Sequence, residues 1–188
     1  LAACSSCPSG TYQGSSSQSV CNRCGKGNFA AGQSNLACAK CDAGKYTTST
    51  TASICTPCNA GDFQSSTGMS FCSHCIKGKI SAQGSASCTP CAPGSYAPVN
   101  GSSSCTPCGL GKFAAGSGAT VCQPCASGSY ANTKSALTCQ VCSPGTITTN
   151  TSIGELGLLL RCVADLDSPV LQRARAVRQA RTKALVRS

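Results

Sequence analysis

Cysteine is the residue type in this chain with the clearest chemical potential, and its spacing is regular. Eighteen of the 19 cysteines form nine Cys-x-x-Cys pairs, and each pair begins 17 residues after the previous one, except for a step of 16 residues between Cys72 and Cys88. Cysteines bind zinc or form disulfides, so the spacing predicts one of these two chemistries. A fixed short period also predicts a tandem array, in which each unit is too small to bury a core alone.

Disulfides are favoured over zinc. A zinc ribbon uses two Cys-x-x-Cys pairs as one tetrahedral site, whereas nine evenly spaced pairs do not group naturally into sets of two. The one histidine, His74, lies between Cys72 and Cys75, where most other pairs have Arg, Lys, Pro or Val, so we expect a solvated spacer. Sparse charge and the Asn-x-Ser sites at Asn100 and Asn150 are typical of a secreted glycoprotein. We therefore expect no metal and no cofactor, with a zinc-binding cysteine array as an alternative.

Two disulfide pairings remain open, because connectivity cannot be deduced from spacing alone. The favoured pairing joins the second cysteine of each pair to the first cysteine of the next, because this closes one loop per repeat. It gives the bonds Cys7–Cys21, Cys24–Cys38, Cys41–Cys55, Cys58–Cys72, Cys75–Cys88, Cys91–Cys105, Cys108–Cys122 and Cys125–Cys139. The alternative interlocks alternate repeats, through bonds such as Cys4–Cys21 and Cys7–Cys24.

The favoured pairing assigns no partner to Cys4, Cys142 and Cys162. Cys142 begins a ninth unit and Cys162 is the only cysteine downstream of it, so we predict a Cys142–Cys162 bond that closes the array. The longer loop costs little, because closure entropy grows only as the logarithm of loop length. Cys4 is then unpaired, and we expect a fragment of a longer chain that has lost the upstream partner of Cys4. The rival interpretation is a tail outside the native fold, with Cys142 and Cys162 too far apart to join.

The residues between the cysteines also follow the period. A glycine lies three residues after the second cysteine of every pair, and an aromatic residue follows two residues later, with Ile80 and Ile147 as the exceptions. The glycine predicts a backbone with positive φ, or a close approach of the chain to a disulfide. The aromatic ring predicts packing against a neighbouring disulfide, with an exposed ligand-contacting stripe as the alternative. The polar stretch that follows predicts a short hairpin or loop.

Apolar side chains are too few for an ordinary core. Only 4% of the residues are aromatic, there is no Trp, and the residues counted as hydrophobic are largely Ala and Cys. Small scaffolds of this kind need covalent links. The predicted fold class is therefore small and disulfide-rich: an elongated tandem array of 17-residue repeats with short hairpins and loops, in which each repeat contacts only its neighbours, plus a C-terminal segment with a helix.

Several short motifs resemble a known family. The sequence CPSGTY at residues 7–12, CAPGSY at residues 91–96, and SCTPC at residues 87–91 and 104–108 resemble the ephrin-receptor-like cysteine-rich repeat. The single-disulfide submodule of tumour necrosis factor receptors is similar. The resemblance covers residues 4–147 and implies a disulfide repeat in an extracellular or cell-surface protein. It leaves the ligand open, because receptors, adhesion proteins and secreted scaffolds all carry such repeats.

The composition changes after Ile147. We predict tandem cysteine-rich repeats over residues 1–147, a transition segment over residues 148–167, and a basic tail over residues 168–188 that is helical or disordered. The Ser-Pro pair that opens the tail is a typical helix start, and the residues after it are rich in Ala, Leu, Arg and Val. A basic helix that touches an anionic membrane or nucleic acid is an alternative for this tail.

A membrane span is not expected in this chain. The apolar stretch at residues 153–164 is far shorter than the ~20 residues that a spanning helix needs, and it contains Glu155 and Arg161. We therefore expect membrane attachment only through an anchor outside this chain, and no nucleic-acid partner.

No catalytic set stands out, because the chain has one histidine and five scattered acids. We predict a non-enzymatic extracellular spacer or adhesion array within a larger secreted or cell-surface protein, with a protein or glycan partner that the sequence does not identify. The alternative function is a ligand-binding segment of a receptor ectodomain. The candidate for that function is the unit at residues 72–88, with Phe71, His74, Ile76, Lys77, Lys79 and Ile80.

Overall fold

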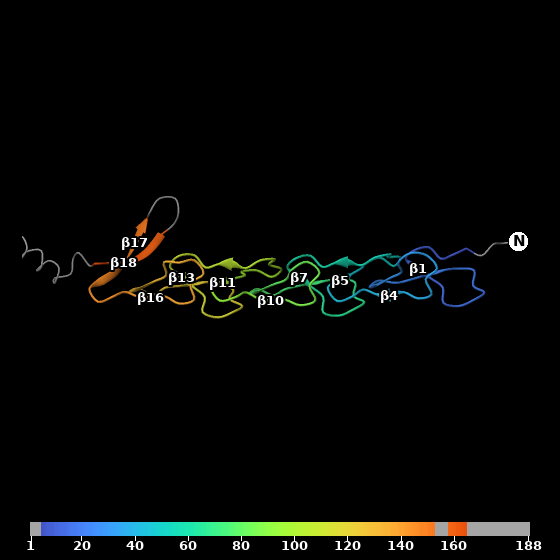
Figure 1. Ribbon diagram of the computed structural model, residues 1–188, viewed down its shortest axis with the longest axis horizontal. Helices are drawn as coiled ribbons and strands as arrows, with labels where there is room; N and C mark the ends of the chain where they lie inside the picture. The colour runs from blue at the N-terminus through green and yellow to red at the C-terminus, as the bar shows by residue number, and fades with distance from the viewer. Residues whose placement is uncertain (1–4, 153–157, 165–188) are drawn as a thin grey trace, which may run out of the picture. The chain divides into compact units, whose positions relative to one another are not determined.

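The structure is a computed structural model, and it describes residues 5–152 and 158–164. Within these residues the chain forms two-stranded antiparallel sheets, each made of two strands that are consecutive in the sequence (Figure 1). This part of the chain contains no helix, and hence none that is long and apolar enough to cross a membrane. The predicted disulfide-rich tandem array of small hairpins is confirmed.

Each repeat forms one hairpin, whose two strands have two residues each. The first strands end on the aromatic or isoleucine position, and they are β1 (Thr11–Tyr12), β3 (Asn28–Phe29), β5 (Lys45–Tyr46), β7 (Asp62–Phe63), β9 (Lys79–Ile80), β11 (Ser95–Tyr96), β13 (Lys112–Phe113) and β15 (Ser129–Tyr130). The second strands lie between the two cysteines of a pair, and they are β2 (Asn22–Arg23), β4 (Ala39–Lys40), β6 (Thr56–Pro57), β8 (Ser73–His74), β10 (Thr89–Pro90), β12 (Thr106–Pro107), β14 (Gln123–Pro124) and β16 (Gln140–Val141).

A turn with a left-handed residue starts each hairpin. In the first repeat the Thr11 N–H donates to the Pro8 carbonyl at 3.2 Å, and Gly10, the third residue of this turn, has a φ of 79°. Positive φ at the third residue is the geometry of a type II turn, which glycine adopts at no steric cost. The equivalent glycine has positive φ in every repeat from Gly10 to Gly145, as the sequence pattern predicts.

A second left-handed position recurs four residues before the first cysteine of a pair, and the sequence analysis missed it. The residues with positive φ at this position are Ser17, Ser34, Gly68, Gly84, Gly101, Gly118 and Ser135. From the second loop on, their N–H groups donate to the carbonyl of the cysteine that opens the preceding loop, as from Ser34 to Cys7 at 2.9 Å and from Gly101 to Cys75 at 2.8 Å. This position therefore links consecutive loops.

A second set of backbone hydrogen bonds also joins loops to the loops that follow them. In six repeats the N–H of the turn glycine donates to the carbonyl of the residue that follows the aromatic position one repeat later, as from Gly27 to Thr47 at 2.9 Å and from Gly44 to Gln64 at 2.7 Å. We call the accepting residue the post-aromatic position. Its members are buried in seven repeats, as Ala30, Thr47, Gln64, Ser81, Ala97, Ala114 and Ala131.

The core consists of half-cystines and the post-aromatic side chains. The largest fully buried side chains are Cys41, Cys58, Cys75, Cys91 and Cys108. The aromatic side chains from Tyr12 to Tyr130 are partly exposed instead. Their predicted packing against disulfides stays a prediction.

Loops contact their second neighbours as well, so the expectation that each repeat contacts only adjacent repeats is wrong. Gly27 approaches the carbonyl oxygen of Gly68, two loops further on, so closely that a Cβ on Gly27 would lie 2.0 Å from that oxygen. Gly61 approaches Gly101 in the same way, with a hypothetical Cβ at 2.1 Å. A Cα hydrogen of each glycine therefore faces a carbonyl oxygen, which is a weak hydrogen bond. The turn glycine is needed for this close approach as well as for its φ.

The shortened loop, residues 75–88, keeps the same contacts as the longer loops. The Gly84 N–H donates to the Cys58 carbonyl at 2.8 Å, and the Gly61 N–H donates to the Ser81 carbonyl at 2.9 Å. The missing residue therefore falls between Ser81 and Gly84, where residues 82 and 83 are exposed. Because the deletion lies on the exposed side of the loop, the contacts between loops continue through it.

The C-terminal part of the described chain is a longer hairpin. Its strands are β17 (Thr146–Ser152) and β18 (Leu158–Ala164), which pair in register over seven residues each (Figure 1). The hairpin crosses the boundary predicted at residue 147 and takes up much of the predicted transition segment, residues 148–167. The helix predicted within residues 168–188 lies outside the described residues.

Contacts within the chain divide it into two compact units. The first unit contains Leu1–Thr106 and Gly116–Val121, and the second contains Pro107–Ala115 and Cys122–Ser188. Each contact between loops given above lies within one of the two units, and the β17–β18 hairpin belongs to the second.

Candidate functional site

The described residues contain nine disulfides, which join cysteines of the Cys-x-x-Cys ladder and Cys162. Eight of them close loops of the repeats, as Cys7–Cys21, Cys24–Cys38, Cys41–Cys55, Cys58–Cys72, Cys75–Cys88, Cys91–Cys105, Cys108–Cys122 and Cys125–Cys139. The ninth joins Cys142 to Cys162, with a Cα–Cα distance of 5.5 Å that is normal for a disulfide. The structure therefore has the favoured pairing, in which the second cysteine of each pair bonds to the first cysteine of the next, and not the pairing that interlocks alternate repeats. Cys4 lies outside the described residues.

The paired sulfurs are not available as metal ligands. A zinc site of the ribbon type needs four thiolates or a mixture of thiolates and imidazoles. Eighteen cysteines are in disulfides, and the part of the chain that the structure describes has no group of three or more His, Cys, Asp or Glu side chains that could hold a metal ion. The zinc-binding cysteine array that the sequence left as an alternative would require these cysteines to be reduced.

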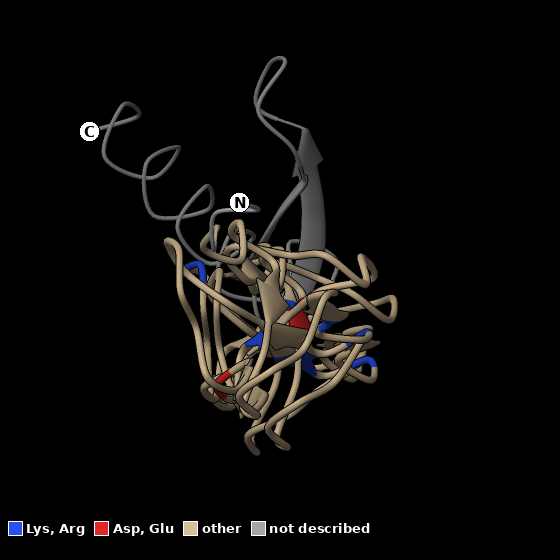
Figure 2. Ribbon diagram, turned by 90° about the vertical axis from the view of Figure 1, so that its right-hand side faces the viewer, with Lys and Arg blue, Asp and Glu red and all other residues tan. Residues whose placement is uncertain are grey.

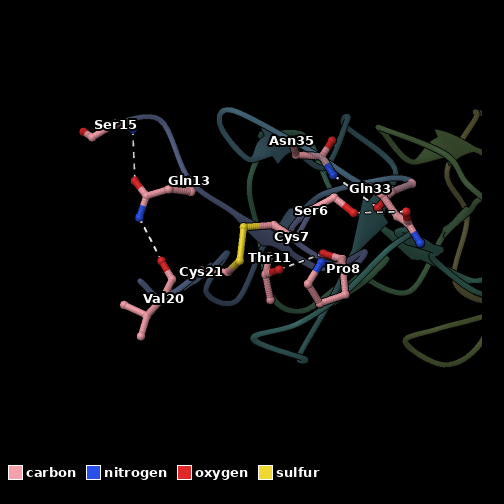
Figure 3. The surroundings of a disulfide bond; sticks show 11 residues. Ser6, Cys7, Pro8, Thr11, Gln13, Ser15, Val20, Cys21, Gln33 and Asn35 are labelled. Atoms are coloured by element: carbon pink, nitrogen blue, oxygen red, sulfur yellow. Dashed lines mark hydrogen bonds between the residues drawn. A yellow bond between two sulfur atoms is a disulfide. The ribbon is translucent and has the colours of Figure 1, made fainter. Parts of the chain in front are cut away.

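Loop side chains stabilise the loops themselves. Figure 3 shows the first loop, where the Gln13 Nε2 donates to the Val20 carbonyl at 2.9 Å and the Gln13 Oε1 accepts from the Ser15 N–H at 3.0 Å. Gln64 bridges the fourth loop in the same manner, with its Nε2 donating to the Phe71 carbonyl at 2.8 Å. These amides are engaged in holding the shape of a loop that has no core of its own.

One imidazole–carboxylate pair lies on the hairpin of β7 and β8. Asp62 and His74 are cross-strand partners, and the His74 Nδ1 lies 2.5 Å from the Asp62 Oδ1. The Asp62 side chain is 19% exposed and the His74 side chain 74% exposed. A carboxylate that orients an imidazole supports hydrolysis only when a nucleophile contacts the other ring nitrogen. Within the described residues no hydrogen bond from a hydroxyl group to this ring is present, and the pair links the two strands of the hairpin.

The predicted ligand-binding unit, residues 72–88, has an apolar edge. Phe71 is 54% exposed and Ile76 is 61% exposed, whereas Lys79 and Ile80 are partly buried in β9. The two most exposed apolar side chains of the unit thus lie in loop segments and not on the hairpin. Exposed apolar residues are suited to a contact with another surface.

The same unit meets the next loop at Asn100. The Lys77 N–H donates to the Asn100 Oδ1 at 2.8 Å. Gly101 lies beside the histidine ring, since a Cβ on Gly101 would be 3.3 Å from the His74 Nδ1. The structure therefore brings His74, Lys77 and Asn100 together, a juxtaposition that the sequence analysis did not predict.

Comparison with known families agrees with this geometry. The family described as "Tyrosine-protein kinase ephrin type A/B receptor-like" matches residues 1–33, 78–121 and 111–152, which is more than half of the chain. The chain belongs to this family. No curated protein matches it. The matched family is a cysteine-rich module of receptor ectodomains and not a catalytic domain, which points to an extracellular or cell-surface location.

The ephrin-receptor-like repeats also carry exposed apolar residues, and apart from Phe71 the sequence analysis did not predict them. We call them the loop-end apolar residues, because they lie one or two residues before the first cysteine of a pair. They are Val20, Leu36, Ile54, Phe71, Val121 and Leu137, and each is at least half exposed. The loops that end at Cys88 and Cys105 have serine before the cysteine. The sequence contains this signal, because an apolar residue lies one or two residues before the first cysteine of six pairs.

Charge on the described repeats is predominantly basic. The acids in the described residues are Asp42 and Asp62, and acidic residues are correspondingly few in Figure 2. Asp42 lies 3.6 Å from the Lys45 Nζ, and Asp62 contacts His74. Both acids therefore have a basic partner, and this part of the chain offers no cluster of carboxylates of the kind that binds calcium.

Proposed function

We propose that the chain is a non-enzymatic extracellular spacer and adhesion array within a larger secreted or cell-surface protein. Membership of a receptor-ectodomain family supports the extracellular setting. The spacer role is supported by the way in which consecutive loops are joined, and the adhesion role by the loop-end apolar residues.

The spacer role is supported by the contacts that a loop makes both with the adjacent loop and with the second loop along. Hydrogen bonds between adjacent loops alone would allow each junction to act as a hinge. The approach of Gly27 to Gly68, and of Gly61 to Gly101, adds a contact to the second loop along. A bend at one junction would then disturb three consecutive loops, so the first unit should resist bending more than a chain of independent modules.

A deletion series tests the spacer role. A variant lacking residues 42–75 joins Cys41 to Ile76, so that Cys41 takes the place of Cys75 as the partner of Cys88 and no disulfide loses one of its cysteines. A variant lacking residues 42–108 removes twice as many repeats in the same way. Solution scattering should show equal decreases of the maximum dimension, from a parent whose radius of gyration exceeds the ~16 Å of a compact chain of this length. A maximum dimension that does not follow the number of repeats would contradict the spacer role.

Bead aggregation tests the adhesion role with the chain itself as the probe. Beads coated with the oxidised chain should aggregate if the loop-end apolar residues bind another copy. The matched variant carries Val20→Ser, Ile54→Ser and Phe71→Ser, because the loops that end at Cys88 and Cys105 already have serine at this position. Equal behaviour of parent and variant would remove the loop-end residues from the adhesion role and leave the spacer role in place.

A ligand-binding segment of a receptor ectodomain is the second candidate function. Phe71 and Ile76 favour it, because both are exposed and lie in or just before the shortened loop, residues 75–88. Binding of this kind should be abolished by substitutions in that unit alone, whereas an adhesive array should lose activity in proportion to the number of loops altered.

A further inference from the structure

We propose that Asn100 is an N-glycosylation site, at which the folded array carries a glycan on the side-chain amide nitrogen. The inference rests on the proposed extracellular function, because the chain must enter a secretory compartment to meet a glycan donor. Asn100, Gly101 and Ser102 form the Asn-x-Ser acceptor sequence.

The amide of Asn100 has a defined orientation. Its oxygen, Oδ1, accepts a hydrogen bond from the Lys77 N–H at 2.8 Å, and Asn100 is exposed. A backbone N–H only donates, so the atom that faces Lys77 must be the oxygen and not the nitrogen. The nitrogen, Nδ2, therefore lies on the other side of the amide carbon, where a glycan can be attached.

Attachment leaves the contact between loops intact. A glycan replaces one hydrogen on Nδ2. Oδ1 still accepts the hydrogen bond from the Lys77 N–H. The neighbouring residues are held independently, since the Gly101 N–H donates to the Cys75 carbonyl at 2.8 Å and the Ser102 Oγ donates to the Val99 carbonyl at 2.7 Å. The loop can therefore carry the modification without rearrangement.

The transfer requires one co-reactant, a lipid-linked oligosaccharyl diphosphate. A new bond forms between Nδ2 of Asn100 and the anomeric carbon of the first sugar. The bond between that carbon and the diphosphate oxygen breaks, and the lipid diphosphate leaves with the electron pair. Nδ2 loses one proton to a base of the transferase, and nothing is oxidised or reduced.

Two exposed apolar residues flank the site. Val99 precedes Asn100, and Ile76 precedes Lys77, and each of these apolar side chains is 61% exposed. Exposed apolar surface close to a glycan is shielded from other proteins. A glycan at Asn100 would therefore restrict adhesion to the loops away from this site.

The second Asn-x-Ser site gives no comparable argument. Asn150 lies within β17, where its backbone pairs with Leu160. Glycosylation of Asn150 stays a prediction from the sequence.

Peptide mapping of the secreted chain tests the proposal. The full chain is expressed behind a cleavable secretion signal in cells with a eukaryotic secretory pathway, then reduced and digested with trypsin. The two sites fall in different peptides, residues 80–112 for Asn100 and residues 135–161 for Asn150. We expect the first peptide to carry a glycan that an amidase releases in heavy-oxygen water, with incorporation of the label.

Matched variants identify the modified atom. Asn100→Gln and Ser102→Ala should abolish the modification of the peptide at residues 80–112, and Ser102→Thr should retain it. An aspartate without label would show spontaneous deamidation of the Asn-Gly pair and would overturn the proposal. An unmodified peptide from a chain that is secreted with its disulfides formed would overturn it too, while leaving the proposed function untouched.

Failure of secretion would count against the proposed function and not against the site. In that case the chain is translated in the presence of microsomes that import it, and the same peptides are mapped. Modification at Asn100 that is lost in Asn100→Gln supports the inference, and an unmodified imported chain overturns it.

Discussion

The repeat loops and the C-terminal hairpin use the same cysteine chemistry in two different ways. A repeat disulfide closes 13 or 14 residues and accompanies strands of two residues, as in the loop closed by Cys75–Cys88. The Cys142–Cys162 disulfide closes 20 residues and accompanies strands of seven residues. The repeats obtain further hydrogen bonds from the following loops, whereas β17 and β18 pair with each other along their whole length.

This difference determines how far the stability of each structure depends on neighbouring segments. A two-residue hairpin is not stable by itself, and even a full two-stranded hairpin is marginal in water. A repeat therefore depends on its disulfide and on the loops before and after it. The β17–β18 hairpin has its hydrogen bonds within one segment, so its failure should remain within that segment.

The largest expected effect comes from removing one disulfide of each kind. The double variant Cys75→Ala, Cys88→Ala should lose about 2–5 kcal/mol of unfolding free energy, because the bond constrains the unfolded chain and its loop has no core of its own. Hydrogen exchange should rise at the Gly101 amide, whose acceptor is the Cys75 carbonyl, and thus beyond the altered loop.

The matched control is Cys142→Ala, Cys162→Ala. Its faster hydrogen exchange should remain within β17 and β18. Equal spreading from both double variants would show that the repeats are no more interdependent than the hairpin.

The next effect compares two turn glycines with the same backbone conformation and different surroundings. Gly61 has a φ of 90°, and a Cβ on it would lie 2.1 Å from the Gly101 carbonyl oxygen. Gly128 has a φ of 78°, and a Cβ on it would have no heavy atom of a non-adjacent residue within 4 Å. Gly128→Ala should cost about 1–2 kcal/mol for the left-handed conformation alone. Gly61→Ala should cost a further 1–3 kcal/mol or so, because backbone must move to admit the methyl group.

Denaturant unfolding of the two variants measures this difference. The m-value should be reported with the midpoint, because a changed m-value would indicate loss of two-state unfolding. Equal destabilisation by Gly61→Ala and Gly128→Ala would mean that the approach to the second loop contributes nothing.

The sequence predicts the covalent ladder and the first turn, because each depends on residues that recur in every repeat. Cysteine spacing identifies the loops, and the glycine that follows each pair identifies the left-handed turn residue. The second left-handed position is harder to find, because serine replaces glycine at Ser34 and Ser135 and the pattern is then incomplete. A serine can occupy this conformation at a cost, so composition alone does not reveal it.

Contacts between loops could not be predicted from the period. The spacing shows which positions are equivalent, but whether one loop reaches the second loop along depends on how far each repeat advances in space. The contact between Lys77 and Asn100 is of this kind, since it joins residues 23 apart in different loops. The β17 strand was missed for another reason: Thr146–Ser152 is rich in Thr, which favours strands, but the prediction followed the apolar composition of the residues after it.

A smaller effect should come from the serines at the second left-handed position. Ser34 has a φ of 59°, so Ser34→Gly should relieve strain and stabilise the first unit by roughly 0.5 kcal/mol after the greater entropy of the unfolded chain is subtracted. Ser65→Gly is the control, because Ser65 does not have positive φ and should lose stability slightly. A destabilised Ser34→Gly, measured by thermal unfolding, would show that the serine side chain contributes more than its conformation costs.

The smallest expected effect concerns the one imidazole–carboxylate pair, and it separates side-chain from backbone contributions within a repeat. Asp62 and His74 are joined by a side-chain hydrogen bond, but the histidine is 74% exposed. Exposed pairs contribute only ~0.2–1 kcal/mol, so a double-mutant cycle of Asp62→Ala and His74→Ala should give a coupling energy in this range. Asn28 and Lys40 occupy the same cross-strand position two hairpins earlier and provide the control cycle, with a coupling energy near zero. A coupling energy of several kcal/mol for Asp62 and His74 would mean that side chains hold this hairpin together. The smaller value would instead indicate that the repeats are stabilised mainly by their disulfides and by the backbone hydrogen bonds between loops.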